Sequence, residues 1–131
     1  MNGIWMHIRS SKIGAFHQQK GKKMKRDLTQ LNKVEKYLKT KGISYERVDE
    51  WAPPNYLDKH MICVPCFEPR KREWDVICHF GSYGCEEGLL EIYGQIVPEE
   101  TDDSVQGWLT AVDVIELIEV WMKEKDNGQK S

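Results

Sequence analysis

The chain has 131 residues, of which 40% are hydrophobic and 31% are charged, as in an ordinary globular domain. No apolar run approaches the roughly 20 residues of a membrane-spanning helix, and no small-residue cleavage site follows the apolar stretch at 4–8, which disfavours membrane and secreted proteins. We therefore expect one cytoplasmic domain whose four cysteines are mostly reduced.

Charge is divided sharply along the chain. Residues 1–26 hold seven Lys or Arg and no acid, whereas residues 27–131 hold twelve Lys or Arg and twenty-one Asp or Glu. The first part has no sustained periodicity, which predicts a disordered basic tail that could bind nucleic acid. Residues 20–24 also have the composition of a translated ribosome-binding site followed by a start codon, so we expect the natural protein to begin at Met24.

The first expected element is a helix from about Leu28 to Lys41. Its apolar side chains recur every three or four residues, which predicts a face that packs on a core. Asp27 or Thr29 can cap its start, and Gly42 is typical of the left-handed residue that follows a helix. The lysines are expected on its outer side as a solvated face: Lys33, Lys36, Lys39 and Lys41.

Strands are expected in the middle of the chain. Residues that favour β-structure predict strands at 43–51, 60–66 and 73–80, with the prolines at 53, 54 and 65 marking where regular pairing must stop. A turn at 67–72 would join the second and third strands into an antiparallel hairpin. Residues 88–97 fit a fourth strand, although one or two turns of helix fit the same pattern.

The third expected strand leads into the loop around which the domain is organised. Its alternate side chains share one face, which we expect to lie inward beneath the last helix: Trp74, Val76, Cys78 and Phe80. Three glycines follow at 81, 84 and 88, and they predict positive φ angles or a close approach of the backbone. We expect the loop to present Ser82, Tyr83, Glu86 and Glu87 to water, and we expect His79 to be a surface residue or one that anchors the loop.

The clearest expected element is a helix that begins after Thr110. Thr110 and Asp113 form a capping box, and apolar residues follow at helical spacing up to Met122. We expect Trp121 to be buried on the sheet. The sequence thus predicts a two-layer α+β domain over 27–126, with a helix, three or four antiparallel strands and a second helix, followed by a short disordered tail at 127–131.

The cysteines allow an alternative in which the protein holds a structural zinc ion. Zinc requires four thiolate or imidazole ligands that converge in a tetrahedron. The pair Cys63 and Cys66 points to opposite faces of an extended strand, which argues against such convergence. Buried free cysteines and no cofactor are therefore expected, and the alternative ligands are Cys63, Cys66, Cys78 and Cys85 or His79.

An enzyme, such as a hydrolase of unknown type, is a further alternative. Adjacent residues of a strand face opposite ways, so Cys78 and His79 cannot form a nucleophile–base pair. Glu86 and Glu87 could act as general acid and base only beside a partner in a cleft. The pattern of residues therefore favours a protein without catalytic activity.

The second half of the chain is strongly acidic. The segment from Glu86 to Asp126 holds twelve acids and only two bases, Lys123 and Lys125. Such a charge repels nucleic acid and attracts basic proteins. It fits a protein whose partner is a basic, nucleic-acid-binding protein, and it fits more simply a surface that keeps the protein soluble.

Three motifs form a distinctive pattern: WDxICHxGSYG at 74–84, EEGLLE at 86–91 and GWLTA at 107–111. The pattern resembles a family of small uncharacterised proteins from prophages and other mobile elements of Firmicutes. The likeness spans about 28–125 and does not include Cys63, Cys66 or Cys85. The resemblance implies no known activity, but a mobile-element setting implies a host-interaction or anti-defence role rather than a metabolic one.

We therefore expect a non-enzymatic, acidic protein-interaction module. The expected partner is a protein, and the core domain is not expected to bind nucleic acid or a membrane. The expected binding face consists of the five loop residues: His79, Ser82, Tyr83, Glu86 and Glu87.

Overall fold

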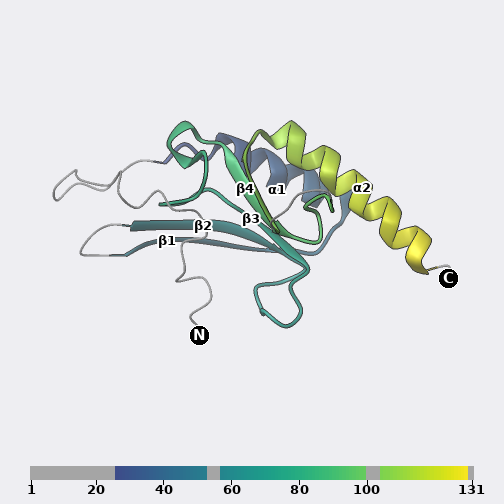
Figure 1. Ribbon diagram of the computed structural model, residues 1–131. Helices are drawn as coiled ribbons and strands as arrows, with labels where there is room; N and C mark the ends of the chain where they lie inside the picture. The colour runs from purple at the N-terminus through teal and green to yellow at the C-terminus, as the bar shows by residue number, and fades with distance from the viewer. Residues whose placement is uncertain (1–25, 53–56, 100–103, 130–131) are drawn as a thin grey trace.

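The computed structural model describes residues 26–52, 57–99 and 104–129 (Figure 1). The α+β fold is confirmed, and none of the helices in these ranges is both long and apolar enough to cross a membrane. Residues 1–25 of the predicted basic tail lie outside the described residues. The elements in chain order are α1 (Thr29–Lys41), β1 (Glu46–Ala52), β2 (Leu57–Val64), β3 (Trp74–Ile77), the short 3-10 helix η3 (Cys85–Glu87), β4 (Leu90–Gly94), β5 (Val105–Leu109) and α2 (Ala111–Gln129).

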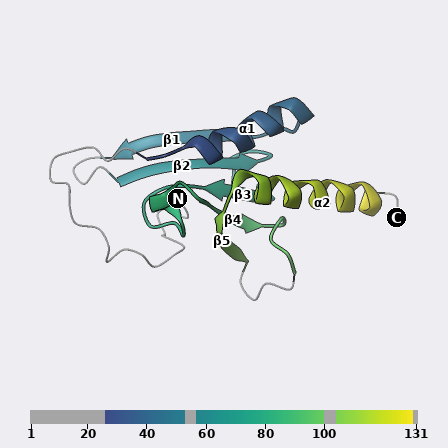
Figure 2. The same cartoon turned by 90° about the horizontal axis from the view of Figure 1, so that it is seen from above.

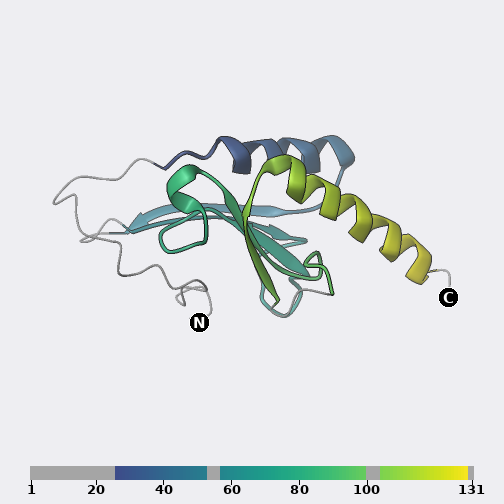
Figure 3. The ribbon, with the colours of Figure 1, turned by 45° about the horizontal axis from the view of Figure 1, so that its top comes forward.

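The strands form one antiparallel sheet in the order β1-β2-β3-β4-β5. The predicted hairpin of the second and third strands is confirmed, and residues 90–94 form a strand rather than a helix. The sheet has five strands instead of three or four, because Val105–Leu109 also pairs with β4. Both helices lie on the same face of the sheet (Figure 3), and the structure therefore has two layers.

The main core lies between the helices and the sheet. Trp74, Val76 and Cys78 face this core, which confirms the predicted inward face of the third strand. The indole of Trp121 on α2 is buried and meets the ring of Trp74 edge to face, with 5.5 Å between the ring centroids. Phe80 departs from the prediction, because β3 ends at Ile77 and Phe80 is only half-buried in the following loop.

The helix termini follow the local sequence signals. The N–H of Thr110 donates to Asp113 Oδ2 at 3.0 Å and the N–H of Asp113 donates to Thr110 Oγ1 at 3.2 Å, which confirms the capping box. Asp27 Oδ1 accepts the N–H of Thr29, and Gly42 ends α1 with a φ of 69°. Helix α2 continues to Gln129, into the stretch expected to be a tail.

The other face of the sheet carries a smaller apolar cluster. Met61, Cys63 and Ile77 are buried there, with Val48 and Phe67 packed against them. The loop after β2 brings Phe67 over this face, where its ring lies 5.1 Å from Lys59 Nζ and 4.9 Å from Arg72 Cζ. The third strand is consequently buried on both faces, not only on the helix side as its alternating pattern predicts.

Candidate functional site

The loop between β3 and β4 is closed by Ser82. The Ser82 hydroxyl donates to the carbonyl oxygen of His79 at 2.8 Å and accepts the backbone N–H of His79 at 3.0 Å. The N–H of Ser82 donates to the same carbonyl oxygen at 2.9 Å. Ser82 is therefore buried, and the prediction that it belongs to a water-exposed binding face is wrong.

The His79 side chain also points into the protein. Its Nδ1 accepts the backbone N–H of His60 on β2 at 3.2 Å, and the residue is buried. Of the two expectations for His79, the surface position is wrong and the loop-anchoring role agrees with the structure, because the chain leaves β3 at Ile77 and turns the ring back onto β2. Since the Ser82 hydroxyl donates to a backbone carbonyl and His79 Nδ1 accepts a backbone N–H, these two side chains are not arranged as nucleophile and base.

Glycines allow the loop to approach β5 closely. Gly81, Gly84 and Gly88 have φ angles of 88°, 91° and 75°, which confirms the predicted positive φ. At Gly84, an added Cβ would lie 2.8 Å from the Cβ of Leu89 and 3.2 Å from the Cα of Trp108. Only a residue without a side chain fits at this point, and the loop therefore packs directly on β5.

The buried carboxyl group of Glu91 fixes the backbone of Tyr83. Glu91 Oε1 on β4 accepts the N–H of Tyr83 at 2.8 Å, and the Glu91 side chain is fully buried. This buried hydrogen bond joins β4 to the loop and therefore holds the loop to the sheet. Sequence patterns alone do not single out Glu91, because an acid between Leu90 and Ile92 is typical of an exposed position on a strand.

Trp108 on β5 lies beside the same loop. Its backbone N–H donates to the carbonyl oxygen of Tyr83 at 3.3 Å, and its side chain is 51% exposed. Its φ is 62°, and in the described part of the chain no other residue except glycine has a positive φ. A bulky residue in this conformation costs on the order of 1–3 kcal/mol. The one sequence signal for this packing is Gly107, where an added Cβ would overlap the Cβ of Tyr83.

The predicted exposure of Glu86 and Glu87 is confirmed. Both lie on η3, which begins directly after Gly84 and therefore starts beside Trp108. Tyr83 is half-buried, and its Cβ lies against Gly107 of β5. We call these four residues the loop–strand surface: Tyr83, Glu86, Glu87 and Trp108. It combines two aromatic side chains with two carboxylates and omits the buried His79 and Ser82.

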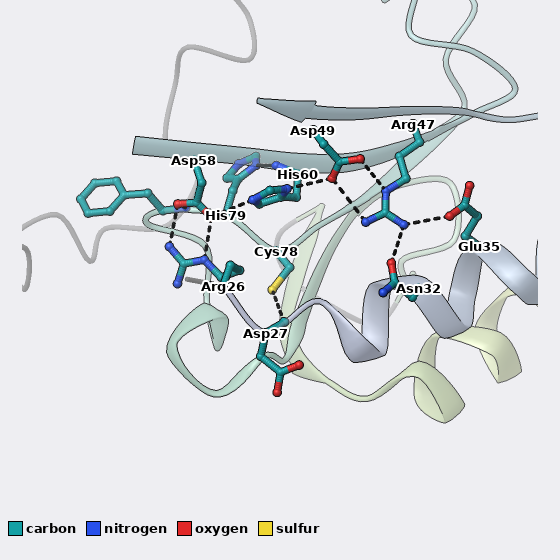
Figure 4. Close-up of polar contacts among 11 residues, drawn as sticks. Arg26, Asp27, Asn32, Glu35, Arg47, Asp49, Asp58, His60, Cys78 and His79 are labelled. Carbon is teal, nitrogen blue, oxygen red and sulfur yellow. Dashed lines mark hydrogen bonds and ion pairs between the residues drawn. The ribbon is translucent and has the colours of Figure 1, made fainter. Parts of the chain in front are cut away.

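A buried ion pair between Arg26 and Asp58 makes hydrogen bonds to the backbone of the loop (Figure 4). Arg26 Nε and Nη2 each donate to a carboxylate oxygen of Asp58 at 2.7 Å, and the two side chains are only 6% and 2% exposed. Asp58 Oδ1 also accepts the N–H of Phe80 at 3.2 Å, and Arg26 Nη1 donates to the carbonyl oxygen of Cys85 at 3.3 Å. Arg26, which the sequence analysis assigns to the tail, thus holds both ends of the loop.

The ion pair is part of a chain of contacts in which basic and acidic side chains alternate: Arg26, Asp58, His60, Asp49 and Arg47. His60 Nδ1 lies 2.8 Å from Asp49 Oδ1, His60 Nε2 lies 3.2 Å from Asp58 Oδ2, and Arg47 pairs with Asp49 at 3.0 Å. Burial opposes ionisation of Asp58, but Arg26 and His60 outweigh it and hold the pKa of Asp58 well below its usual range. Burial likewise opposes the charge of His60, yet Asp58 and Asp49 raise the pKa of His60. The sequence analysis missed this network because its members come from separate elements.

The cysteines lie on different sides of the sheet. Cys63 belongs to the small cluster on the helix-free face, whereas Cys78 and Cys85 belong to the main core. Burial raises the pKa of the Cys63 and Cys78 thiols to about 12 each, so both are poor thiolate ligands or nucleophiles. Across residues 26–52, 57–99 and 104–129, no three His, Cys, Asp or Glu side chains are grouped as metal ligands. The alternative zinc site at Cys63, Cys66, Cys78 and Cys85 is therefore not assembled.

Comparisons of the chain with protein-family models, with curated proteins and with solved structures found no match. A function for the loop–strand surface therefore has to be inferred from its own geometry and chemistry. The relationship to mobile-element proteins stays a prediction.

Proposed function

We propose that the protein is a non-enzymatic protein-interaction module and that the loop–strand surface is its binding site. The observation that carries the proposal is the half-exposed Trp108, held at a positive φ against Tyr83. Strained backbone at a bulky residue is retained where the surrounding structure over-determines it, and such positions cluster at binding and catalytic sites. Tryptophan and tyrosine are also the side chains that most often dominate binding energy at protein interfaces.

The backbone beneath the surface is held in place by polar contacts, as a binding site requires. Tyr83 is fixed by Glu91, and the loop is fixed by Arg26 and Asp58. A pre-organised surface loses little conformational entropy when it binds, which favours affinity. The aromatic side chains therefore provide a rigid anchor rather than a mobile lid.

Glu86 and Glu87 suggest the chemistry of the partner. Both residues are exposed on η3, which follows Tyr83 in the chain, and a partner with Lys or Arg around an apolar contact would complement them. Arg and Lys can also stack on exposed aromatic rings. We therefore propose a basic protein as the partner, and the resemblance to mobile-element proteins suggests that it is a host protein.

Capture experiments with matched variants test this function. The immobilised protein is expected to retain a basic protein from a Gram-positive lysate, with Trp108→Ala abolishing capture at every salt concentration. Glu86→Gln/Glu87→Gln should weaken capture mainly at low salt, because charge interactions are screened as salt increases. The control Glu124→Gln/Asp126→Asn removes the same charge from exposed positions at the end of α2 and should leave capture unchanged. Capture that survives Trp108→Ala would contradict the proposal.

A further inference from the structure

The first turns of the two helices lie side by side and point the same way (Figure 2), and α2 is inclined to α1 (Figure 3). The N–H of Ala111 at the start of α2 donates to Gln30 Oε1 at the start of α1 at 2.7 Å. Two turns further along, the hydroxyl of Tyr37 donates to Glu119 Oε2 at 3.2 Å. Each residue of α1 therefore lies at about the same height along the helix pair as the residue of α2 that comes 81 or 82 positions later in the sequence.

The helices expose opposite charges. Every exposed charged side chain of α1 is a lysine: Lys33, Lys36, Lys39 and Lys41. In contrast, the exposed charges in the first turns of α2 are all acidic: Asp113, Glu116 and Glu119. Because Leu31, Val34 and Leu38 face the sheet, helical periodicity places Lys33 and Lys36 on the side of α1 that points away from it. The outer surface of the helix layer thus has a basic row next to an acidic row.

Helix α2 also exposes apolar side chains on this surface. Val112 and Val120 are 63% and 50% exposed, and they flank Glu116 at intervals of four residues on one side of the helix. The acidic row therefore contains apolar contacts that a partner could cover.

We propose that the outer surface of the helix layer binds a second copy of this chain, so that α1 of each copy packs on α2 of the other. A twofold axis parallel to the helices places α1 over the partner's α2 without any shift along the axis. A rotation about this axis does not change the height of any residue along the helices. Lys33 and Lys36 of one copy therefore lie at the same height as the acidic row of the other copy. A twofold axis perpendicular to the helices within the interface would instead place lysines on lysines.

The same arrangement covers the valines. Lysine side chains have long apolar stems that can lie on Val112 and Val120 while their ammonium groups reach Glu116. Like charges that face each other across an interface cost several kcal/mol, so the charge pattern selects one orientation of the copies. This interface uses neither Trp108 nor the loop, and it therefore goes beyond the proposed function.

Sedimentation velocity of the full chain at low and high salt is the first test. We expect dimers at low ionic strength that dissociate at about 1 M salt, where the screening length falls to roughly 3 Å. A chain that stays monomeric at low salt and at the highest soluble concentration would overturn the proposal. A dimer whose stability does not change with salt would overturn it as well.

A charge-swap experiment tests the pairing of the helices. Lys33→Glu/Lys36→Glu and Glu116→Lys/Glu119→Lys should each weaken self-association by more than about tenfold, because both halves of the symmetric interface become repulsive. An equimolar mixture of the two variants should regain the dimer, since both halves of the mixed interface pair opposite charges. Circular dichroism of each variant checks that its fold is intact.

A matched control changes the same charges elsewhere. Arg70→Glu/Lys71→Glu alters exposed residues of the loop after β2, on the other side of the sheet, and should leave the dimer unchanged. Failure of the mixture to form dimers, or equal weakening by the control, would show that α1 and α2 do not pair between copies.

Discussion

The backbone N–H of Trp108 donates to the carbonyl oxygen of Tyr83 at 3.3 Å, and this contact joins β5 to the loop after β3. The approach is possible because neither Gly84 nor Gly107 carries a Cβ at the junction. The two motifs GSYG and GWLTA, which lie apart in the sequence, therefore form one structural unit. Its outer side is the loop–strand surface.

The strain at Trp108 predicts an unusual order of stabilities. Alanine normally makes a protein more stable than glycine, but at a φ of 62° the Cβ of alanine is strained and glycine is not. We expect Trp108→Gly to be more stable than Trp108→Ala by about 1 kcal/mol. Urea unfolding of the two variants measures the difference, and a more stable alanine variant would show that the backbone at this position is not strained.

Gly107 should tolerate no side chain. A Cβ at this position would overlap the Cβ of Tyr83, so Gly107→Ala must push the loop away from β5. We expect a loss of about 1–3 kcal/mol in the free energy of unfolding, as for other overpacked sites. Gly42→Ala is the comparison, because it has a positive φ but open space around it. Urea unfolding measures both variants, and a loss of stability in Gly107→Ala no larger than in Gly42→Ala would contradict the proposed contact.

The elements that sequence reasoning predicted depend on local signals. Trp74, Val76 and Cys78 face the helices because their spacing and their apolar character agree, and the capping box of α2 is a contact between near neighbours. Strand β5 was missed because it is short, contains Gly107 and exposes its tryptophan. Its pairing with β4 depends on the rest of the sheet, which no local pattern reveals.

Arg26 and Asp58 should be essential for stability. Asp58→Asn leaves the Arg26 guanidinium buried without a counter-charge. We expect this change to lower the free energy of unfolding by about 3–5 kcal/mol. Replacing both residues, as in Arg26→Met/Asp58→Leu, should cost clearly less than the sum of Arg26→Met alone and Asp58→Leu alone. Denaturant unfolding of the three variants measures the coupling, and additive effects would show that the pair is not a unit.

The same pair predicts how stability depends on pH. The pKa of Asp58 is lower in the folded protein than in the unfolded chain, because Arg26 and His60 outweigh the opposing effect of burial. Ionised Asp58 therefore stabilises the fold. This stabilisation is complete above the pKa of Asp58 in the unfolded chain, about 4, and is lost as the pH falls toward its lower pKa in the folded protein. We expect the wild type to lose more stability than Asp58→Asn between about pH 5 and 2. Parallel curves for the two proteins would contradict this assignment.

The contact between Trp74 and Trp121 should be a major part of the core. Trp121→Ala removes a buried indole that meets Trp74 edge to face, and we expect a loss of about 3–5 kcal/mol. Lys123→Ala on the exposed side of the same helix should change stability by less than about 0.5 kcal/mol. Thermal and urea unfolding compare the variants. A small effect of Trp121→Ala would mean that α2 does not pack on β3 through this residue.

The candidate site was only partly predictable. Glycines at 81, 84 and 88 and the charges of Glu86 and Glu87 correctly indicated a shaped loop with exposed acids. The burial of His79 and Ser82 depends on the N–H of His60 and on hydrogen bonds within the turn, which the sequence does not specify. No local sequence pattern predicts a positive φ at Trp108, so this feature also required the fold.

The affinity of Trp108→Ala for the captured partner tests the central proposal most directly. If Trp108 anchors the interface, titration calorimetry should show a Kd at least about 30-fold weaker than that of the wild type, equivalent to roughly 2 kcal/mol. Trp108→Gly should bind equally poorly despite its relaxed backbone, because the side chain makes the contact. An affinity of Trp108→Ala within about twofold of the wild type would contradict a binding site at the loop–strand surface.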